Sequence, residues 1–257
     1  MTLSASNGRV ALVTGGAKGI GAKVCQTLAS NGFKVWVADK DELSAQAWAD
    51  ELQKKRGQAQ AVLLDVADPA SVAQVFAAVE AQDGRCDVLV NSAGIAKVFP
   101  FLDFPLDNFL ATMAVNVTGT LLCAQHAARL MLPQHWGRIV NIASVAGLRA
   151  VGKGRTAYGT SKGAVVALTR QMAVELAEHG ITANAVCPGP VDTPMTRELH
   201  SEQFRIEYAK AIPMARYGMT TEVAAAVMFF VSDEASYTTG AALPVDGGFM
   251  SAGAPGL

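Results

Sequence analysis

Short runs of apolar residues alternate along the chain with longer segments of helical periodicity, and this alternation constrains the fold more than any other feature. The apolar runs are continuous, which is typical of strands buried on both faces. Such strands form parallel sheets whose connecting helices cover both faces. We therefore expect an α/β fold, a doubly wound parallel sheet of about seven strands with helices on both faces. The expected strands are residues 10–13, 33–38, 61–64, 88–90, 139–143, 181–186 and 242–245.

The segments between these runs carry helix start and stop signals. Asp68 and Pro69 supply an N-cap and a first-turn proline for a helix that runs to about residue 82. No linker rich in Pro or Ser and no internal repeat interrupts the series, so we expect one domain over residues 1–257. The other expected helices are residues 20–31, 41–55, 106–132 and 157–179.

Composition excludes several classes of protein. Hydrophobic residues make up 51% of the 257 residues, which excludes a disordered chain. The 21 Lys and Arg against 22 Asp and Glu provide no positive surplus, so we expect no nucleic-acid partner. No segment approaches the ~18 apolar residues of a membrane span, and residues 1–8 lack a secretory signal. We therefore expect a cytoplasmic protein without a membrane partner.

The cysteines and histidines show no pattern of metal ligands. The four cysteines form no CxxC pair and lie in apolar stretches, so we expect them to be reduced core residues. The four histidines are scattered, and we expect no metal site. The cysteines are Cys25, Cys86, Cys123 and Cys187.

A glycine-rich turn, residues 14–21, joins the first expected strand to the first expected helix. Gly15, Gly19 and Gly21 let backbone N–H groups approach a pyrophosphate, and the helix N-terminus adds positive potential. The turn therefore predicts a dinucleotide site, with Lys18 and Ile20 among its contacts.

Asp39 ends the second expected strand, where a carboxylate accepts hydrogen bonds from an adenosine ribose. It would also repel a 2′-phosphate, because like charges at about 4 Å cost about 1 kcal/mol in water and about 4 kcal/mol at an intermediate dielectric. We therefore expect NAD as the cofactor. Lys18 and Lys40 could neutralise a phosphate, so NADP stays possible.

Tyr158 and Lys162 are four residues apart at the start of a long expected helix, which places both side chains on one face. A cation beside a phenol lowers the phenol pKa. Ser144 follows the 139–143 strand at the carboxyl edge of the sheet, where its hydroxyl could hold the same oxygen. The three residues predict an acid and base for an alcohol or carbonyl oxygen.

Further motifs follow in a fixed order along the chain. They are Asp65 and Val66 after the third strand, Asn91-Ser92-Ala93-Gly94 after the fourth, Asn116 in the long helix, and the segments 188–193 and 245–248. With the glycine turn and the Ser, Tyr and Lys above, these motifs make the chain resemble the short-chain dehydrogenase/reductase family over nearly its whole length. The resemblance implies a single Rossmann-like domain and an oxidoreductase.

The resemblance also implies roles for the residues near the reaction. Tyr158 would donate or accept the proton, and Ser144 would polarise the substrate oxygen. Lys162 would bind the nicotinamide ribose and lower the pKa of Tyr158. Asn116 would hold a water molecule that links Lys162 to solvent.

Contacts to the dinucleotide are implied along the same edge. Asp65 and Val66 would flank the adenine, and Asn91 would lie along the adenosine ribose. Val191 and Thr193 would meet the carboxamide. The other cofactor contacts expected from these motifs are Ala93, Gly94, Pro188 and Gly189.

The chain departs from the family pattern in three places. Ser92 stands where the family usually has asparagine, and Ser144 precedes Tyr158 by 14 positions, one more than in many members. Acyl-carrier-protein reductases of the family tend to carry basic residues at positions that here hold Gln134, His135, Trp136 and Val174. This lowers the rank of an NADPH-dependent 3-oxoacyl reductase, which we keep as an alternative.

We therefore predict an NAD-dependent oxidoreductase of a small secondary alcohol, polyol or hydroxy acid, or of the matching ketone. A halide-expelling lyase would need arginine in place of Lys162. A dinucleotide sensor without turnover has no need of Ser144, Tyr158 and Lys162 together. Serine hydrolase chemistry is not expected, since Ser144 lacks the flanking glycines.

Three further expectations concern the substrate, the lid and the assembly. Arg149, Lys153 and Arg155 lie between Ser144 and Tyr158 without a carboxylate among them, so they either bind an anionic substrate group or form a solvated loop. Residues 190–216 are expected to form a mobile lid over the cofactor. The family resemblance implies a homotetramer, with the helices that start at Leu106 and Ala157 paired across subunits.

Overall fold

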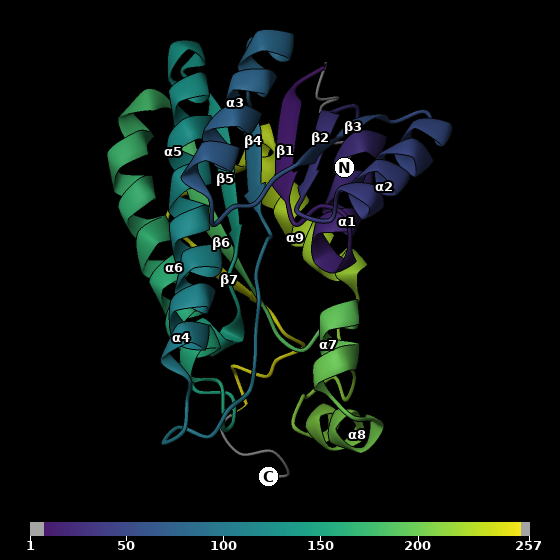
Figure 1. The fold of residues 1–257 in the computed structure, drawn as a ribbon, viewed down its shortest axis with the longest axis vertical. Coiled ribbons are helices and arrows are strands. Elements are labelled where there is room, and N and C mark those ends of the chain that lie inside the picture. Colours follow the sequence, from purple (N-terminus) through teal and green to yellow (C-terminus); the bar gives the residue numbers. More distant parts are fainter. Residues whose placement is uncertain (1–7, 253–257) are drawn as a thin grey trace.

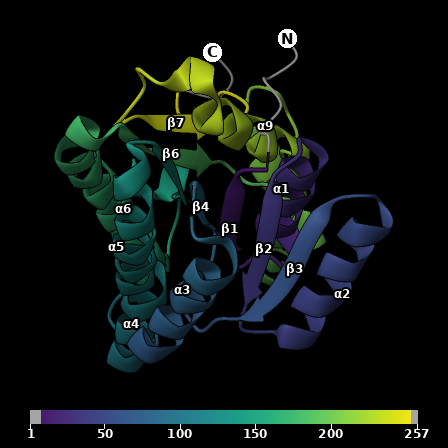
Figure 2. The same cartoon turned by 90° about the horizontal axis from the view of Figure 1, so that it is seen from above.

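The structure, a computed structural model, describes residues 8–252, which form one seven-stranded sheet with all strands parallel. The strand order is β3-β2-β1-β4-β5-β6-β7, with helices on both faces (Figure 1, Figure 2). The expected doubly wound α/β fold is confirmed. Residues 1–7 and 253–257, which hold the N-terminal segment without an expected signal and most of the tail, lie outside the described residues.

The strands and helices follow the expected alternation, with small shifts at their ends. The strands are β1 (Val10–Thr14), β2 (Lys34–Asp39), β3 (Gln58–Leu63), β4 (Val88–Asn91), β5 (Gly137–Ile142), β6 (Ile181–Pro188) and β7 (Ala242–Val245). The helices are α1 (Gly19–Ser30), α2 (Glu42–Lys54), α3 (Pro69–Asp83), α4 (Leu106–Met113), α5 (Gly119–Met131), α6 (Thr156–Leu176), α7 (Pro194–Leu199), α8 (Glu202–Lys210) and α9 (Thr220–Val231). Within residues 8–252, no helix has the length and apolar character needed to cross a membrane.

Alternate residues of the strands pack into two separate hydrophobic cores, one on each face of the sheet. Val13, Val37 and Val90 pack on one face against α1, α2 and α9. Leu12 and Leu89 pack on the other face against α3, α5 and α6. Both faces of the central strands are thus buried, which is why these strands are continuously apolar in sequence. The four cysteines are unpaired and buried, as expected.

Local signals set the helix ends. Asp68 caps α3 by accepting a hydrogen bond from the backbone N–H of Ala70 at 2.9 Å, and Pro69 opens the helix. Gly84 ends it with a φ of +66°, a conformation that glycine adopts without strain. The predicted Asp68-Pro69 start is therefore confirmed.

The expected single helix 106–132 is interrupted. A π-helical turn, Ala114–Thr118, separates α4 from α5, and a 3₁₀ turn, Leu132–Gln134, follows α5. Asn116 lies within the π turn. The apolar pattern of the sequence does not distinguish such a turn from a regular α-helix, and π turns are frequent at functional sites.

The segment 190–216, expected only as a lid, contains the short helices α7 and α8. Thr193 and Thr196 form a reciprocal capping box at the start of α7. Ser201 caps α8 by accepting a hydrogen bond from the backbone N–H of Phe204 at 3.2 Å. These helices project beyond the sheet at the lower end of Figure 1.

Candidate active site

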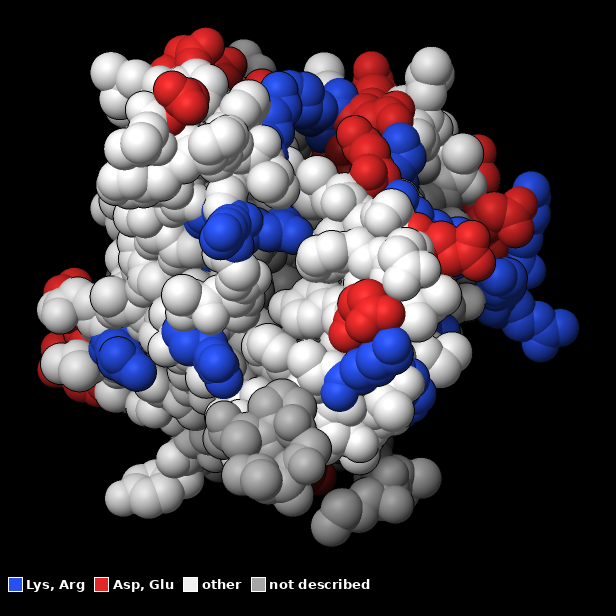
Figure 3. Space-filling view, turned by 90° about the horizontal axis from the view of Figure 1, so that it is seen from below, with Lys and Arg blue, Asp and Glu red and all other residues white. Residues whose placement is uncertain are grey.

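The parallel topology brings the candidate residues to one edge of the sheet. Ser144 follows β5, the glycine turn follows β1, and Tyr158 and Lys162 lie in the first turns of α6. Because the carboxyl ends of all seven strands meet at this edge, residues far apart in sequence come together there. Figure 3 shows the molecule from this side.

Ser144 and Tyr158 share a hydrogen bond. Ser144 is 8% exposed, and its Oγ accepts a hydrogen bond from the backbone N–H of Ala146 at 3.1 Å. Its hydroxyl proton is therefore free to be donated. Burial raises the pKa of Tyr158, while the hydrogen bond from Ser144 and the positive charge of Arg155 act in the opposite direction. The phenol is thus protonated at neutral pH.

Lys162 is buried close to Tyr158. Its Nζ donates to the carbonyl oxygen of Ile142 at 2.7 Å and lies 5.8 Å from the centre of the Tyr158 ring. Burial lowers the pKa of Lys162 to about 8. Because burial is the largest effect at the phenol, the pKa of Tyr158 is raised, and the expectation that Lys162 together with the cofactor's positive charge lowers it stays a prediction.

Asn116 is 1% exposed, and its side chain ties three segments together. Its Oδ1 accepts from the N–H of Ile95 at 2.9 Å, and its Nδ2 donates to the Ile95 carbonyl at 3.0 Å. The same Nδ2 lies 2.9 Å from Ser161 Oγ, which donates to the Tyr158 carbonyl at 2.8 Å. The amide therefore supports the first turn of α6 and the segment after β4.

Glycines allow the close approaches in the β1–α1 turn. A Cβ on Gly15, which has a φ of +62°, would lie 2.8 Å from the Ala93 backbone. A Cβ on Gly21 would lie 2.1 Å from the Gly15 carbonyl oxygen. Gly19 has a φ of +57° and faces Thr193, the N-cap of α7, with 3.6 Å between a Cβ built on Gly19 and Thr193 Cβ. The predicted turn thus exists, with its glycines at the positions of closest approach.

Asp39 lies beside this turn. Its carboxylate accepts hydrogen bonds from the backbone N–H groups of Ala17 and Asp41, both at 3.1 Å. Lys18 pairs with Asp41 at 2.7 Å, and Lys40 lies 3.8 Å from Asp65. Each lysine that could meet a 2′-phosphate therefore already has a carboxylate partner.

Asn91 and Thr14 hold the segment after β4 against the turn. Thr14 Oγ1 accepts from the N–H groups of Ser92 and Ala93, both at 3.1 Å. Asn91 donates to Asn141 at 2.9 Å, and its own Oδ1 is buried without a partner. A buried unpartnered acceptor beside the glycine turn fits the hydroxyls of a dinucleotide ribose. The residues present therefore suit a dinucleotide.

The remaining predicted cofactor contacts lie around the same edge. Ile20 packs partly buried against the core below the turn, and Val66 is buried against Gly119. Gly94 lies between Asn116 and Lys162, with 3.5 Å between a Cβ built on it and Lys162 Nζ. The others follow strands: Asp65 lies after β3, Pro188 ends β6, Gly189 bonds to the β7 carbonyl of Val245, and Val191 and Thr193 lead into α7.

Sequence reasoning missed several residues that build the site. Thr14 and Ser161 bond the candidate segments to one another, and His200 reaches Arg155 from 45 positions away in sequence. The only sequence signal for the role of Thr14 is that it is a polar residue at the end of a strand, and this signal is weak. Nothing in the local sequence indicates the contact of His200.

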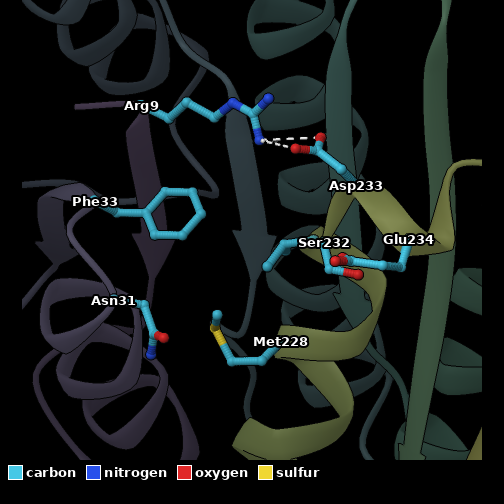
Figure 4. Close-up of a pocket in the computed structure, with 8 residues that line it drawn as sticks. Arg9, Asn31, Phe33, Met228, Ser232, Asp233 and Glu234 are labelled. Atoms are coloured by element: carbon cyan, nitrogen blue, oxygen red, sulfur yellow. Dashed lines mark hydrogen bonds and ion pairs between the residues drawn. The ribbon is translucent and has the colours of Figure 1, made fainter. Parts of the chain in front are cut away.

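A separate pocket lies at the opposite edge of the sheet (Figure 4). Arg9 and Phe33, which line it, precede β1 and β2, so it faces the amino ends of the strands. Arg9 pairs with Asp233 at 3.1 Å across this pocket. None of the candidate residues described above lines it.

Comparison with known proteins gives consistent matches over the full site. A family model described as "Enoyl-(Acyl carrier protein) reductase" matches residues 15–250. The chain is 38% identical to the 3-oxoacyl-(acyl-carrier-protein) reductase FabG of Aquifex aeolicus, over 95% of this chain and 98% of the relative. It is 37% identical to the D-threitol dehydrogenase of Mycolicibacterium smegmatis, over 95% and 93%.

A solved structure of similar shape is a gluconate 5-dehydrogenase from Burkholderia cenocepacia in complex with NADP and tartrate. It superposes with a TM-score of 0.91 at 34% identity, and the match covers 96% of each chain.

Proposed function

This chain belongs to the short-chain dehydrogenase/reductase family, and on that basis we propose that it is an NAD-dependent oxidoreductase of small alcohols. It would transfer a hydride between the nicotinamide and a secondary alcohol, polyol or hydroxy acid, or the matching ketone. The observation that carries the proposal is the placement of Ser144, Tyr158 and buried Lys162 at the same edge of the sheet as the glycine turn. A sensor would need only the turn.

We assign the proton transfer to Tyr158. Its protonated hydroxyl donates to a carbonyl oxygen in reduction, and its ionised form accepts the alcohol proton in oxidation. Ser144, whose proton is not used by Ala146, donates to the same oxygen. Lys162 supplies the buried positive charge that favours a phenolate. A bound nicotinamide supplies the hydride chemistry.

We assign the NAD preference to Asp39. Replacing Asp39 with Asn removes the charge that opposes a 2′-phosphate, and we expect the ratio of kcat/KM for NADP to that for NAD to rise about tenfold or more. Steady-state rates with both cofactors measure this ratio. Glu42→Gln, which removes an exposed carboxylate at the start of α2, is the matched control and leaves the ratio unchanged. An unchanged ratio in Asp39→Asn contradicts the assignment.

The 3-oxoacyl reductase named among the relatives supports an alternative activity. In that case the preferred cofactor would be NADPH and the substrate an acyl thioester. Val174, 76% exposed on α6, stands where acyl-carrier-protein reductases tend to carry a basic residue, which lowers the rank of this alternative. Comparing acetoacetyl-CoA with small ketones as substrates separates the two activities.

We propose a single catalytic domain with residues 190–216 as its lid, and a homotetramer. Arg197 and Arg205 both pair with Asp192 at 2.8 Å, which holds α7 and α8 as a unit that could close. Leu106 and Leu110 on α4 are 70% and 58% exposed, an apolar surface that subunit contacts would cover. Protection from protease by NADH tests the lid, and sedimentation at micromolar protein concentration tests the homotetramer.

The four unpaired cysteines support a reducing, cytoplasmic location.

A further inference from the structure

Arg155 presents a positive charge one helical turn before Tyr158. It is the N-cap residue of α6 and is partly buried. Within residues 8–252, no carboxylate forms an ion pair with it. The positive charge of Arg155 acts on Tyr158, the proposed proton donor, because it opposes the rise in the pKa of that phenol. Arg155 is therefore an unneutralised cation beside the site.

A neutral histidine holds this arginine in place. Arg155 Nη2 lies 2.8 Å from His200 Nε2, and because a guanidinium only donates, His200 Nε2 accepts. The Nδ1 of a neutral ring then carries the proton and donates to the Tyr217 hydroxyl at 3.0 Å. Burial, with Arg155 and Arg205, lowers the pKa of His200 to about 4. The contact therefore orients Arg155 without neutralising its charge.

Other arginines of the neighbouring lid segment are paired differently. Arg197 and Arg205 share Asp192, each at 2.8 Å, so their charges are matched by a carboxylate. Arg155, in contrast, has a neutral acceptor. A fixed guanidinium with spare donors is suited to bind a carboxylate through paired hydrogen bonds.

A second arginine and an aromatic wall complete the surroundings. Arg149 lies 5.4 Å from the centre of the Phe249 ring, and Tyr208 packs edge-on against that ring at 5.6 Å. The charges of Arg155 and Arg149 both act to lower the pKa of Tyr208, against a larger rise from burial. Tyr158 acts in the opposite direction and raises the pKa of Tyr208. Figure 3 shows Lys and Arg side chains beside a hollow on this face.

We propose that Arg155, held by His200, binds the carboxylate of a short hydroxy acid or of the matching oxo acid, with Arg149 as a second positive charge nearby. This inference rests on the proposed oxidoreductase function and narrows its substrate class. One helical turn separates Arg155 from Tyr158, or about 5–6 Å between Cβ atoms, which suits a carboxylate a few bonds from the reacting carbon. Lys153 is exposed and forms no hydrogen bond or ion pair within the described part of the chain.

Matched substrate pairs test the proposal, since each pair differs only by a carboxylate in place of CH₂OH. The pairs are 3-hydroxybutanoate with butane-1,3-diol, threonate with threitol, and gluconate with sorbitol. We expect wild-type protein to favour the acid in at least one pair. Arg155→Gln should lower kcat/KM for that acid by about 10- to 100-fold, the range of a hydrogen bond to a charged group, and change the neutral partner by less than about threefold.

His200 is a positioning residue, and its variants separate orientation from folding. His200→Phe removes the acceptor and should lower kcat/KM for the acid selectively, whereas His200→Gln keeps a side-chain acceptor and should restore much of it. Lys153→Gln removes a positive charge from the same loop and should change neither substrate. Calorimetric titration of NADH-loaded protein with tartrate gives a readout without turnover, and we expect at least about tenfold weaker binding in Arg155→Gln.

Distinct results overturn the two proposals. Equal losses for acid and neutral partner in Arg155→Gln, or wild-type protein that favours the neutral partner in every pair, overturn the carboxylate site and leave the oxidoreductase proposal intact. Preference for sorbitol 6-phosphate over gluconate would show that Arg155 binds a phosphate group, and this result also overturns the carboxylate site. If no compound is turned over, the oxidoreductase proposal fails, and tartrate binding that is equal in wild type and Arg155→Gln overturns the carboxylate site separately.

Discussion

Tyr158→Phe is expected to lower kcat by about 10² to 10⁴-fold, the range attributed to a positioned general acid or base. The substitution removes only the hydroxyl, which is hydrogen-bonded to Ser144. The ring stays in place and Lys162 keeps its bond to Ile142, so NADH should bind as it does to the wild type. Steady-state turnover and NADH fluorescence titration measure the two quantities separately.

Tyr237→Phe is the matched control for this prediction. Tyr237 is fully exposed, so Tyr237→Phe should change neither turnover nor NADH binding. A Tyr158→Phe protein that binds NADH and keeps a third or more of wild-type kcat would show that another group transfers the proton.

Gly21→Ala is expected to weaken dinucleotide binding by about tenfold or more and to lower the free energy of unfolding by about 1–3 kcal/mol. The new Cβ would lie 2.1 Å from the Gly15 carbonyl oxygen, a backbone atom that cannot rotate away. The turn must shift, and its N–H groups shift with it. NADH titration and chemical denaturation report the two effects.

Gly84→Ala separates the binding effect from a general loss of stability. Gly84 has a φ of +66° at the end of α3, and a Cβ there would meet nothing within 4 Å. Alanine in this conformation should cost about 1–2 kcal/mol and leave NADH binding unchanged. Wild-type NADH affinity in Gly21→Ala would show that the turn does not hold the dinucleotide.

The features that depend on continuous apolar runs or on short motifs were predictable from sequence. All seven strands were expected, and in the central ones burial on both faces demands continuous apolar residues such as Val35 and Val37. The glycine turn was expected because Gly15 and Gly19 need positive φ and Gly21 needs close contact. Asp68 and Pro69 marked a helix start through local chemistry alone.

Features that depend on tertiary contacts were not predictable. The π turn at Asn116 follows from the bonds of its amide to Ile95 and Ser161, which no periodicity reports. The contact of Arg155 with His200 joins segments that are distant in sequence. The rise in the pKa of Tyr158 that burial causes was not predictable either, because the i, i+4 spacing predicts a neighbouring cation but not the cost of burial.

The central claim is that the chain catalyses alcohol-dependent reduction of a dinucleotide. The most direct test is NADH formation from NAD with wild-type protein over a panel of secondary alcohols, polyols and hydroxy acids. We predict NADH formation with at least one member of the panel. Normal NADH binding without turnover of any alcohol, or of any matching ketone in the reverse direction, would contradict the claim and favour a dinucleotide sensor.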